Sequence, residues 1–201
     1  MDFAEAAFYD VLRRRRMVRN YTDDPVDPDV LDRVVAAGLR GPSAGNTQGT
    51  DLLVLTGDAV ARYWSTTLPS QRRAEFPWPG LLRAPVLVLV VTSAAAYRQR
   101  YAEPDKAATG LGEAEWPVPF WYVDAGAAIM AVLLAATAEG LGALLFGTFE
   151  HEAAIREEFG IPGERSIAGV VALGHRAPDR RSKSAQRSRR TTADAVHRNR
   201  W

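Results

Sequence analysis

The sequence predicts one domain of the mixed α/β or α+β class, in which a sheet is covered by helices. Its 201 residues are enough for one sizeable core and leave room for only a small second domain. Apolar runs of strand length are separated by segments with helical periodicity. The most apolar segment, residues 120–146, indicates a helix at the centre of the fold or of a dimer. Residues 1–201 are therefore expected to form a single domain.

Two amphipathic helices are predicted in the N-terminal part of the chain. The first covers residues 3–16, with apolar side chains three and four positions apart, and it ends in four consecutive arginines. The second follows Asp27, which can cap a helix, and Pro28, which suits a first helical turn. The Gly-Pro pair at 41–42 ends this second helix.

Three strands are predicted, at residues 51–56, 85–91 and 167–173. The second is apolar on both faces and is therefore expected at the centre of a covered sheet. An Ala-rich helix at 120–138 and a further helix at 148–159 precede the third strand. Asp124 and Glu139 argue against a membrane span in this region, so the helix is expected to pack inside the protein.

The sequence excludes several kinds of site. With no cysteine, the chain has no iron–sulfur cluster, thiolate zinc site or cysteine nucleophile. Its three histidines lack the spacing of metal ligands, so no metal is expected. The sequence Gly41-Pro42-Ser43-Ala44-Gly45 matches the hydrolase elbow only formally, because it follows a helix instead of a strand. Neither a Walker lysine loop nor a dinucleotide-binding glycine motif occurs. The acidic N-terminus does not resemble a secretory signal, so we expect a cytoplasmic protein without a membrane partner.

Positive charge is concentrated at the C-terminal end of the chain. The basic C-terminal extension, residues 176–201, carries nine Lys or Arg against two Asp, whereas the rest carries 16 against 22 acidic residues. This extension and the arginines at 13–16 can be solvated segments, an arm for nucleic acid, or ligands for an anion. Because the chain shows no evident acid, base or nucleophile, we favour a cofactor-dependent enzyme whose arginines bind the phosphate of a mononucleotide.

Five groups of short motifs resemble, in order, those of the FMN-dependent nitroreductase family. They are Arg15-Arg16-Met17-Val18-Arg19-Asn20-Tyr21 with Pro25-Val26; Gly41-Pro42-Ser43-Ala44-Gly45-Asn46-Thr47-Gln48; Gly140-Leu141-Gly142 with Phe146-Gly147-Thr148-Phe149; Phe159-Gly160-Ile161-Pro162; and Val171-Ala172-Leu173-Gly174 with Arg187-Ser188-Arg189. The resemblance covers nearly the whole chain. It implies an α+β fold with a central, mostly antiparallel sheet flanked by helices. It also implies an intertwined homodimer with FMN at the interface and the 120–138 helix in the dimer core.

The resemblance further implies which residues bind FMN. Arg15 and Arg16 would lie near the phosphate and ribityl chain, and Arg19 near the pyrimidine edge, where a cation stabilises the negative charge of reduced flavin. The other implied residues are Pro42, Ser43, Asn46 and Gln48 from the second subunit, Phe146, Gly147 and Thr148 along the flavin ring, and Arg187 and Arg189 at the phosphate.

Two positions depart from the family pattern. Met17 stands where the family usually has a small hydroxyl residue, which affects one hydrogen bond to the phosphate. Gly49-Thr50 stands where a Pro-Trp pair is frequent, which affects the entrance to the flavin.

Residues 97–119 are predicted to form a long loop or lid, because they show no clean period and contain many turn formers. Flat aromatic surfaces stack well with nitroaromatics and quinones, so the aromatic residues here are candidates for the acceptor pocket. They are Tyr97, Tyr101, Trp116, Phe120 and Trp121, with Tyr122 beside them. The alternative is that these side chains pack a lid or an interface.

The expected activity is ping-pong transfer of electrons from NADH or NADPH, through FMN, to a small organic acceptor. No side chain is expected to be catalytic, with Arg19 acting as an electrostatic stabiliser. A deazaflavin donor, and dehalogenation or dehydrogenation reactions, stay open at this point. Two alternatives are a flavin-binding protein without turnover and a nucleic-acid-binding protein that uses the basic extension.

Overall fold

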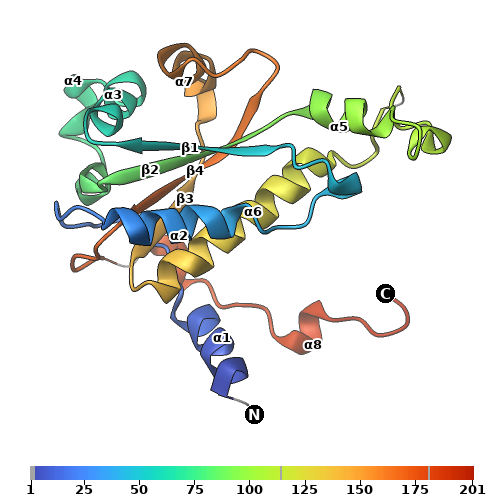
Figure 1. Cartoon of the computed structure of the whole chain (residues 1–201). Helices are drawn as coiled ribbons and strands as arrows, with labels where there is room; N and C mark the ends of the chain where they lie inside the picture. Colours follow the sequence, from blue (N-terminus) through green and yellow to red (C-terminus); the bar gives the residue numbers. More distant parts are fainter. Residues whose placement is uncertain (1–2, 114, 181) are drawn as a thin grey trace.

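A computed structural model describes residues 3–113, 115–180 and 182–201. Its centre is a sheet of four antiparallel strands in the order β1-β2-β4-β3 (Figure 1). The strands are β1 (Thr50–Thr56), β2 (Val86–Thr92), β3 (Gly142–Phe146) and β4 (Ser166–Gly174). Helices flank this sheet on both faces, so the α+β architecture implied by the resemblance is confirmed.

Strand β2 is the apolar centre of the sheet, as its sequence predicts. All seven of its residues are buried, and it pairs with β1 on one side and β4 on the other. Successive side chains of a strand point to opposite faces. Leu87 and Leu89 accordingly enter one core layer, and Val86, Val88 and Val90 enter the other.

Helices α2 (Pro28–Gly38) and α6 (Phe120–Ala138) cover one face of the sheet. Asp27 caps α2 as predicted, its side chain accepting hydrogen bonds from the backbone N of Asp29 and Val30 at 2.9 and 3.2 Å. Helix α6 is long and apolar enough to cross a membrane, but helices in a protein core can have the same length and composition. Its buried side chains, which include Val132 and Leu133, pack in the core layer shared with α2 and the sheet.

The other face is covered by α3 (Asp58–Thr67) and α7 (Glu152–Phe159), with the short helices α4 (Ser70–Arg73) and η2 (Pro79–Arg83) nearby. Tyr63 and Trp64 of α3 and Ile155 of α7 are buried in this layer. Helix α3 has no counterpart among the predicted elements. The predicted helix at 148–159 is divided into a 3-10 turn, η4 (Phe149–His151), and α7.

The apolar stretch 120–146 contains two elements. Helix α6 ends at Ala138, Gly140 adopts a left-handed φ of 80°, and the chain returns as strand β3. Strand β3 pairs with β4 along its whole length, and Met17 bridges to its Ala143. Apolar content alone does not separate a buried helix from the buried strand that follows it.

The prediction of a long loop or lid at residues 97–119 is wrong at its start, where the chain is still helical. Helix α5 (Ala94–Tyr101) occupies its beginning, and a 3-10 turn, η3 (Ala107–Thr109), follows. Ser93 caps α5 by accepting a hydrogen bond from the backbone N of Ala96 at 3.2 Å. Four residues of α5 are charged or aromatic and three are alanine, so no one-sided apolar stripe marks it in the sequence.

Both ends of the chain extend beyond the sheet on the side of α6 (Figure 1). Helix α1 (Phe3–Arg14) projects at one end. The chain that follows β4 forms a C-terminal arm, which contains η5 (Lys183–Gln186) and α8 (Thr192–Ala195). From residue 183 onward every residue of this arm is exposed.

Candidate functional site

Arginines from both ends of the chain meet in one cavity of about 1290 Å³, which we call the arginine cavity. It is lined by the end of α1, the segment that follows it, and the C-terminal arm. Among the described residues, its lining includes one acid, Asp179, and eight arginines: Arg13, Arg15, Arg16, Arg19, Arg176, Arg180, Arg187 and Arg189. The structure thus brings together the five arginines that the sequence assigned to FMN. Met17 also lines this cavity.

Arg15 is the cavity arginine that has a buried donor without a partner among the described residues. Its Nη1 is buried and has no hydrogen-bond partner among the described residues, although the side chain as a whole is half-buried. A buried donor left unpaired costs roughly 1–3 kcal/mol, and more when it is charged. A phosphate oxygen in the cavity would supply the missing acceptor.

The segment after Arg16 is fixed to the sheet, which places the arginines. Val18 donates a backbone hydrogen bond to the carbonyl of Ala143 in β3 at 2.9 Å. Tyr21 is fully buried, and its hydroxyl donates to the carbonyl of Val18 at 2.9 Å. Burial raises the pKa of Tyr21 far above its ordinary value, so the hydroxyl stays a donor.

Trp78 lies beside the arginine cavity and was not predicted from the sequence. The guanidinium carbons of Arg19 and Arg180 lie 5.2 and 4.4 Å from the centroid of its ring. Such contacts restrain the direction of a guanidinium group. The backbone N of Arg19 also donates to Asp179 at 2.7 Å. Trp78 therefore connects an arginine from each end of the chain.

The second group of predicted residues forms a turn before β1, residues 42–48, which we call the polar turn. Asn46 and Gln48 have left-handed φ values of 54° and 53°, which are uncommon outside glycine. Residues held this way cost about 1–3 kcal/mol each and cluster at functional sites. The Ser43 hydroxyl accepts from the backbone N of Gln48 at 2.9 Å, while Asn46 and Gln48 are exposed.

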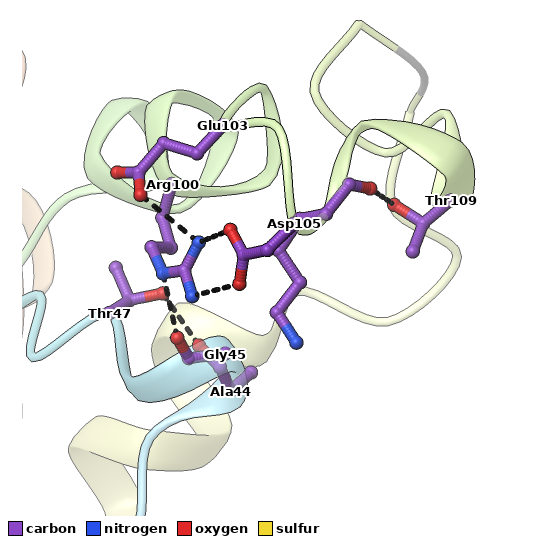
Figure 2. Close-up of polar contacts among 8 residues, drawn as sticks. Ala44, Gly45, Thr47, Arg100, Glu103, Asp105 and Thr109 are labelled. Atoms are coloured by element: carbon purple, nitrogen blue, oxygen red, sulfur yellow. Dashed lines mark hydrogen bonds and ion pairs between the residues drawn. The ribbon is translucent and has the colours of Figure 1, made fainter.

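Two side chains behind the polar turn, those of Asp124 and Arg100, bond its backbone, and Figure 2 shows the contact of Arg100 with Gly45. Asp124 of α6, 7% exposed, accepts from the backbone N of Ala44 at 2.8 Å and from the hydroxyl of Tyr97 at 2.7 Å. Arg100 Nε donates to the carbonyl of Gly45 at 2.8 Å. Burial and then Asp124 raise the pKa of Tyr97 well above its ordinary value, which keeps its hydroxyl protonated.

The sequence did not assign a functional role to Asp124 or Arg100. In the sequence, the charge of Asp124 indicated only that its helix does not span a membrane. A carboxylate inside the most apolar helix is the signal that could have marked it, since a buried charge needs hydrogen-bond donors. Arg100 carried no comparable signal, because it lies in a segment interpreted as a loop.

The arginine cavity and the polar turn lie toward opposite ends of the sheet. Thr50, just after the polar turn, pairs with Thr92 at one end of β2. Met17, in the arginine cavity, bridges to Ala143 of β3, which pairs with Leu173 of β4. Leu173 in turn pairs with Val86, at the other end of β2. Within one chain the two groups therefore do not form a common site.

The third predicted group, Phe146-Gly147-Thr148, begins at the last residue of β3. The Phe146 ring stacks on Trp64, with centroids 5.8 Å apart and planes 12° apart, so its side chain faces the core. Its neighbour Phe149 is 81% exposed, with a left-handed φ of 49°. Phe149 was missed as a candidate, although it stands in the same sequence motif.

The five aromatic residues predicted for the acceptor pocket form one cluster. Trp116 is at its centre, with ring centroids 4.7 to 6.1 Å from those of Tyr97, Tyr101, Phe120 and Trp121. Tyr97 has no exposed surface, so the alternative of structural packing describes it better. Phe120 is 40% exposed and is the most accessible of the five. Gly49 packs on Tyr97, since a Cβ there would lie 2.6 Å from Tyr97 Cε2.

Comparison with known proteins gives a consistent result. The family model described as Nitroreductase family matches residues 12–175. A 4-nitrobenzoate reductase from Nocardioides sp. (strain LMS-CY) is 31% identical over 198 residues, covering 84% of this chain and 80% of that protein. An NADH dehydrogenase from Thermus thermophilus is 27% identical over 186 residues, covering 83% and 85%.

Solved structures show the same fold. Nitroreductase A from Vibrio parahaemolyticus superposes with a TM-score of 0.71 at 18% identity, covering 97% of this chain and 77% of that one. A nitroreductase-like protein from Desulfovibrio desulfuricans, solved in complex with FMN, gives a TM-score of 0.63 at 24% identity, covering 92% and 96%. With the family model spanning most of its length, the chain belongs to the nitroreductase family, a family of oxidoreductases.

Proposed function

We propose that this protein is a homodimeric FMN oxidoreductase that takes electrons from NADH or NADPH and passes them to a small organic acceptor. The observation that carries the proposal is the arginine cavity, where eight arginines face one acid and Arg15 Nη1 is buried without a partner. A dianionic phosphate would offset part of this excess of positive charge and supply the missing acceptor. The FMN bound in a solved structure of the same fold supports the choice of mononucleotide.

The protein's residues contribute binding and electrostatics. Arg15 and Arg16, with Arg187 and Arg189 of the arm, hold the phosphate, and the Arg19 guanidinium presents positive charge to the pyrimidine edge. FMN itself supplies the electron-transfer chemistry when it is bound. Arg19 packs on Trp78, which restrains the direction of its guanidinium group. Met17 also lines the cavity, but the arginines around it, and not Met17, bind the phosphate.

A second copy of the chain is needed to bring the polar turn to the arginine cavity, because the two lie at opposite ends of one sheet. Helix α6 offers a surface for this contact, since Tyr122, Val123 and Met130 are exposed on it. The exposed C-terminal arm also fits a segment that lies on another subunit. The dimeric site would then combine the cavity of one subunit with the polar turn and its Ser43, Asn46 and Gln48 from the other.

The acceptor pocket is proposed to lie at the aromatic cluster around Trp116. Phe120 is its most exposed member, and planar acceptors such as nitroaromatics or quinones stack on such rings. The relative named for 4-nitrobenzoate reduction supports a nitroaromatic acceptor. Donor and acceptor using one site in turn predicts ping-pong kinetics. Initial rates at several fixed acceptor levels should give parallel double-reciprocal lines, and intersecting lines would contradict the shared site.

The absorption spectrum of the purified protein tests the cofactor. We expect a yellow protein that retains FMN and bleaches on addition of NADH or NADPH without oxygen. A yellow protein that does not bleach would indicate flavin binding without turnover. A colourless protein that takes up no FMN and binds DNA in a salt-dependent way would support the nucleic-acid alternative.

Mixed dimers test the shared site. One variant carries Arg15→Ala and Arg16→Ala, and the other carries Asn46→Ala and Gln48→Ala, so each homodimer is expected to have little activity. A heterodimer of the two has one intact site of two, so an equal mixture after subunit exchange should recover about a quarter of wild-type activity, by the symmetry of a two-fold dimer. A site built within one chain would recover nothing.

A further inference from the structure

We propose that Arg100 is a positioning residue for the polar turn, which it holds together with Asp124 so that Asn46 and Gln48 meet the flavin ring. This inference rests on the proposed function, and it gives helix α5 a role that differs from the lid expected for its segment. The residue is neither in the arginine cavity nor in any of the motifs that carry the family resemblance.

Two side chains of opposite charge form hydrogen bonds with the backbone of two successive residues of the polar turn. The Asp124 carboxylate accepts from the backbone N of Ala44 at 2.8 Å. The Arg100 Nε donates to the carbonyl of Gly45 at 2.8 Å. The backbone between these two bonds is therefore fixed at both a donor and an acceptor, immediately before Asn46.

Asn46 and Gln48 need such support because their left-handed conformations are disfavoured for residues with a Cβ. Bonds within the turn join its residues to one another, since the backbone N of Asn46 and of Gln48 donate to the carbonyl and the hydroxyl of Ser43, each at 2.9 Å. They do not attach the turn to the rest of the protein. A strained backbone persists only where its surroundings determine it. Asp124 and Arg100 supply these surroundings.

Arg100 is itself oriented for this purpose (Figure 2). Its Nη1 and Nη2 donate to the two oxygens of Asp105 at 2.7 and 2.8 Å, and Nη1 also reaches Glu103 at 3.2 Å. This bidentate pair leaves Nε directed at Gly45. The pKa of Asp105 is lowered, first by its hydrogen bond with Arg100, so the carboxylate is charged at neutral pH.

Helix α5 supports both contacts with the polar turn, one directly through Arg100 and the other through the bond of Tyr97 with Asp124. Tyr97, which donates to Asp124 at 2.7 Å, and Arg100 lie three residues apart and so share one face of α5. Tyr101 of the same helix packs against Gly45, where an added Cβ would lie 2.8 Å from Tyr101 Cε2. The helix therefore acts as a fixed support for the turn.

The experiment compares Arg100→Ala and Arg100→Lys with Arg98→Ala, which removes an exposed arginine from the same helix. Each variant is titrated with FMN, and the visible circular dichroism of the bound flavin reports the surroundings of its ring. Arg100→Ala should weaken FMN binding about tenfold, equivalent to about 1.4 kcal/mol, and change the visible spectrum. Arg100→Lys should have an intermediate effect on FMN binding, because a lysine keeps the positive charge but lacks the planar guanidinium group that bonds Asp105 and Gly45 together. Arg98→Ala should match wild type.

A purely structural role would lower thermal stability while leaving the affinity and the flavin spectrum of the folded protein unchanged, and that result would overturn the positioning role. Asp105→Asn provides a second approach if Arg100→Ala does not fold, since it keeps Arg100 but removes its orienting charge. It should shift the flavin spectrum in the same direction, and an unchanged spectrum and affinity would also overturn the role. A wild-type protein that binds no FMN would instead overturn the proposed function itself.

Discussion

The arginine cavity and the polar turn are built on different physical principles. The cavity is formed by charged side chains from two ends of the chain that are far apart in sequence, and its arm is exposed. The polar turn is formed by a short backbone segment with left-handed residues, held by buried and half-buried groups of α5 and α6. The cavity selects its ligand by charge, whereas the turn presents groups through a fixed conformation.

This difference predicts how each region responds to ionic strength and to substitutions. Interactions of exposed charges weaken with ionic strength, so the cavity should be sensitive to salt. Hydrogen bonds between buried groups are screened much less, so the turn should be sensitive to substitutions that alter its backbone or its supports. Raising the ionic strength should therefore reduce the effect of variants in the arginine cavity and change the effect of variants in the polar turn much less.

The largest effect is expected for Arg15→Ala. Its Nη1 is the buried, unpaired donor of the arginine cavity, so its removal should weaken FMN binding about 100-fold, equivalent to about 2.7 kcal/mol. Fluorescence titration of the apoprotein with FMN measures this. Arg14→Ala is the matched control, because Arg14 is exposed, is paired with Asp10 and does not line the cavity. Equal losses in both variants would show that helix charge, and not a phosphate contact, determines binding.

A smaller effect is expected for Gly45→Ala in the polar turn. The new Cβ would lie 2.8 Å from Tyr101 Cε2, in a residue with a φ of 61°. Backbone strain and overpacking together should lower the free energy of unfolding by about 2 kcal/mol. Gly160→Ala is the control, since Gly160 has similar left-handed dihedral angles (φ 64° and ψ 30°, against 61° and 17° for Gly45) but no atom within 4 Å of an added Cβ. Chemical denaturation should show a smaller loss for Gly160→Ala, and equal losses would exclude the contact with Tyr101.

The two regions also differ in how far the sequence predicts them. The arginines at 15–19 and 187–189 stand in runs of charge, and the structure brings them to one cavity. The sheet and most of its helices follow from apolar periodicity. Strand β3 was not predicted, because it closely follows α6 in one continuous apolar stretch. Helix α5 was hidden because its polar and aromatic residues do not form an apolar face.

The contacts of Arg100 and Asp124 with the polar turn could not be predicted from the sequence either, because they join segments that are far apart in the chain. Arg100 is 55 residues and Asp124 is 80 residues from the backbone atoms that they bond. No local pattern specifies such a pairing, because it depends on the packing of α5 and α6 against the polar turn. Trp78 is similar, since its contacts with Arg19 and Arg180 join three separate segments.

The smallest effect is expected for the double variant Arg187→Ala and Arg189→Ala in the arm. Both side chains line the arginine cavity but are exposed, so solvent weakens their pull on a phosphate. FMN affinity should fall about fivefold at low salt and by less at high ionic strength. The control replaces Arg198 and Arg200, which belong to the same arm without lining the cavity. A loss that is equal in both double variants would assign the effect to the net charge of the arm, and a loss that is independent of salt would mean that the arm contributes conformation, as the polar turn does.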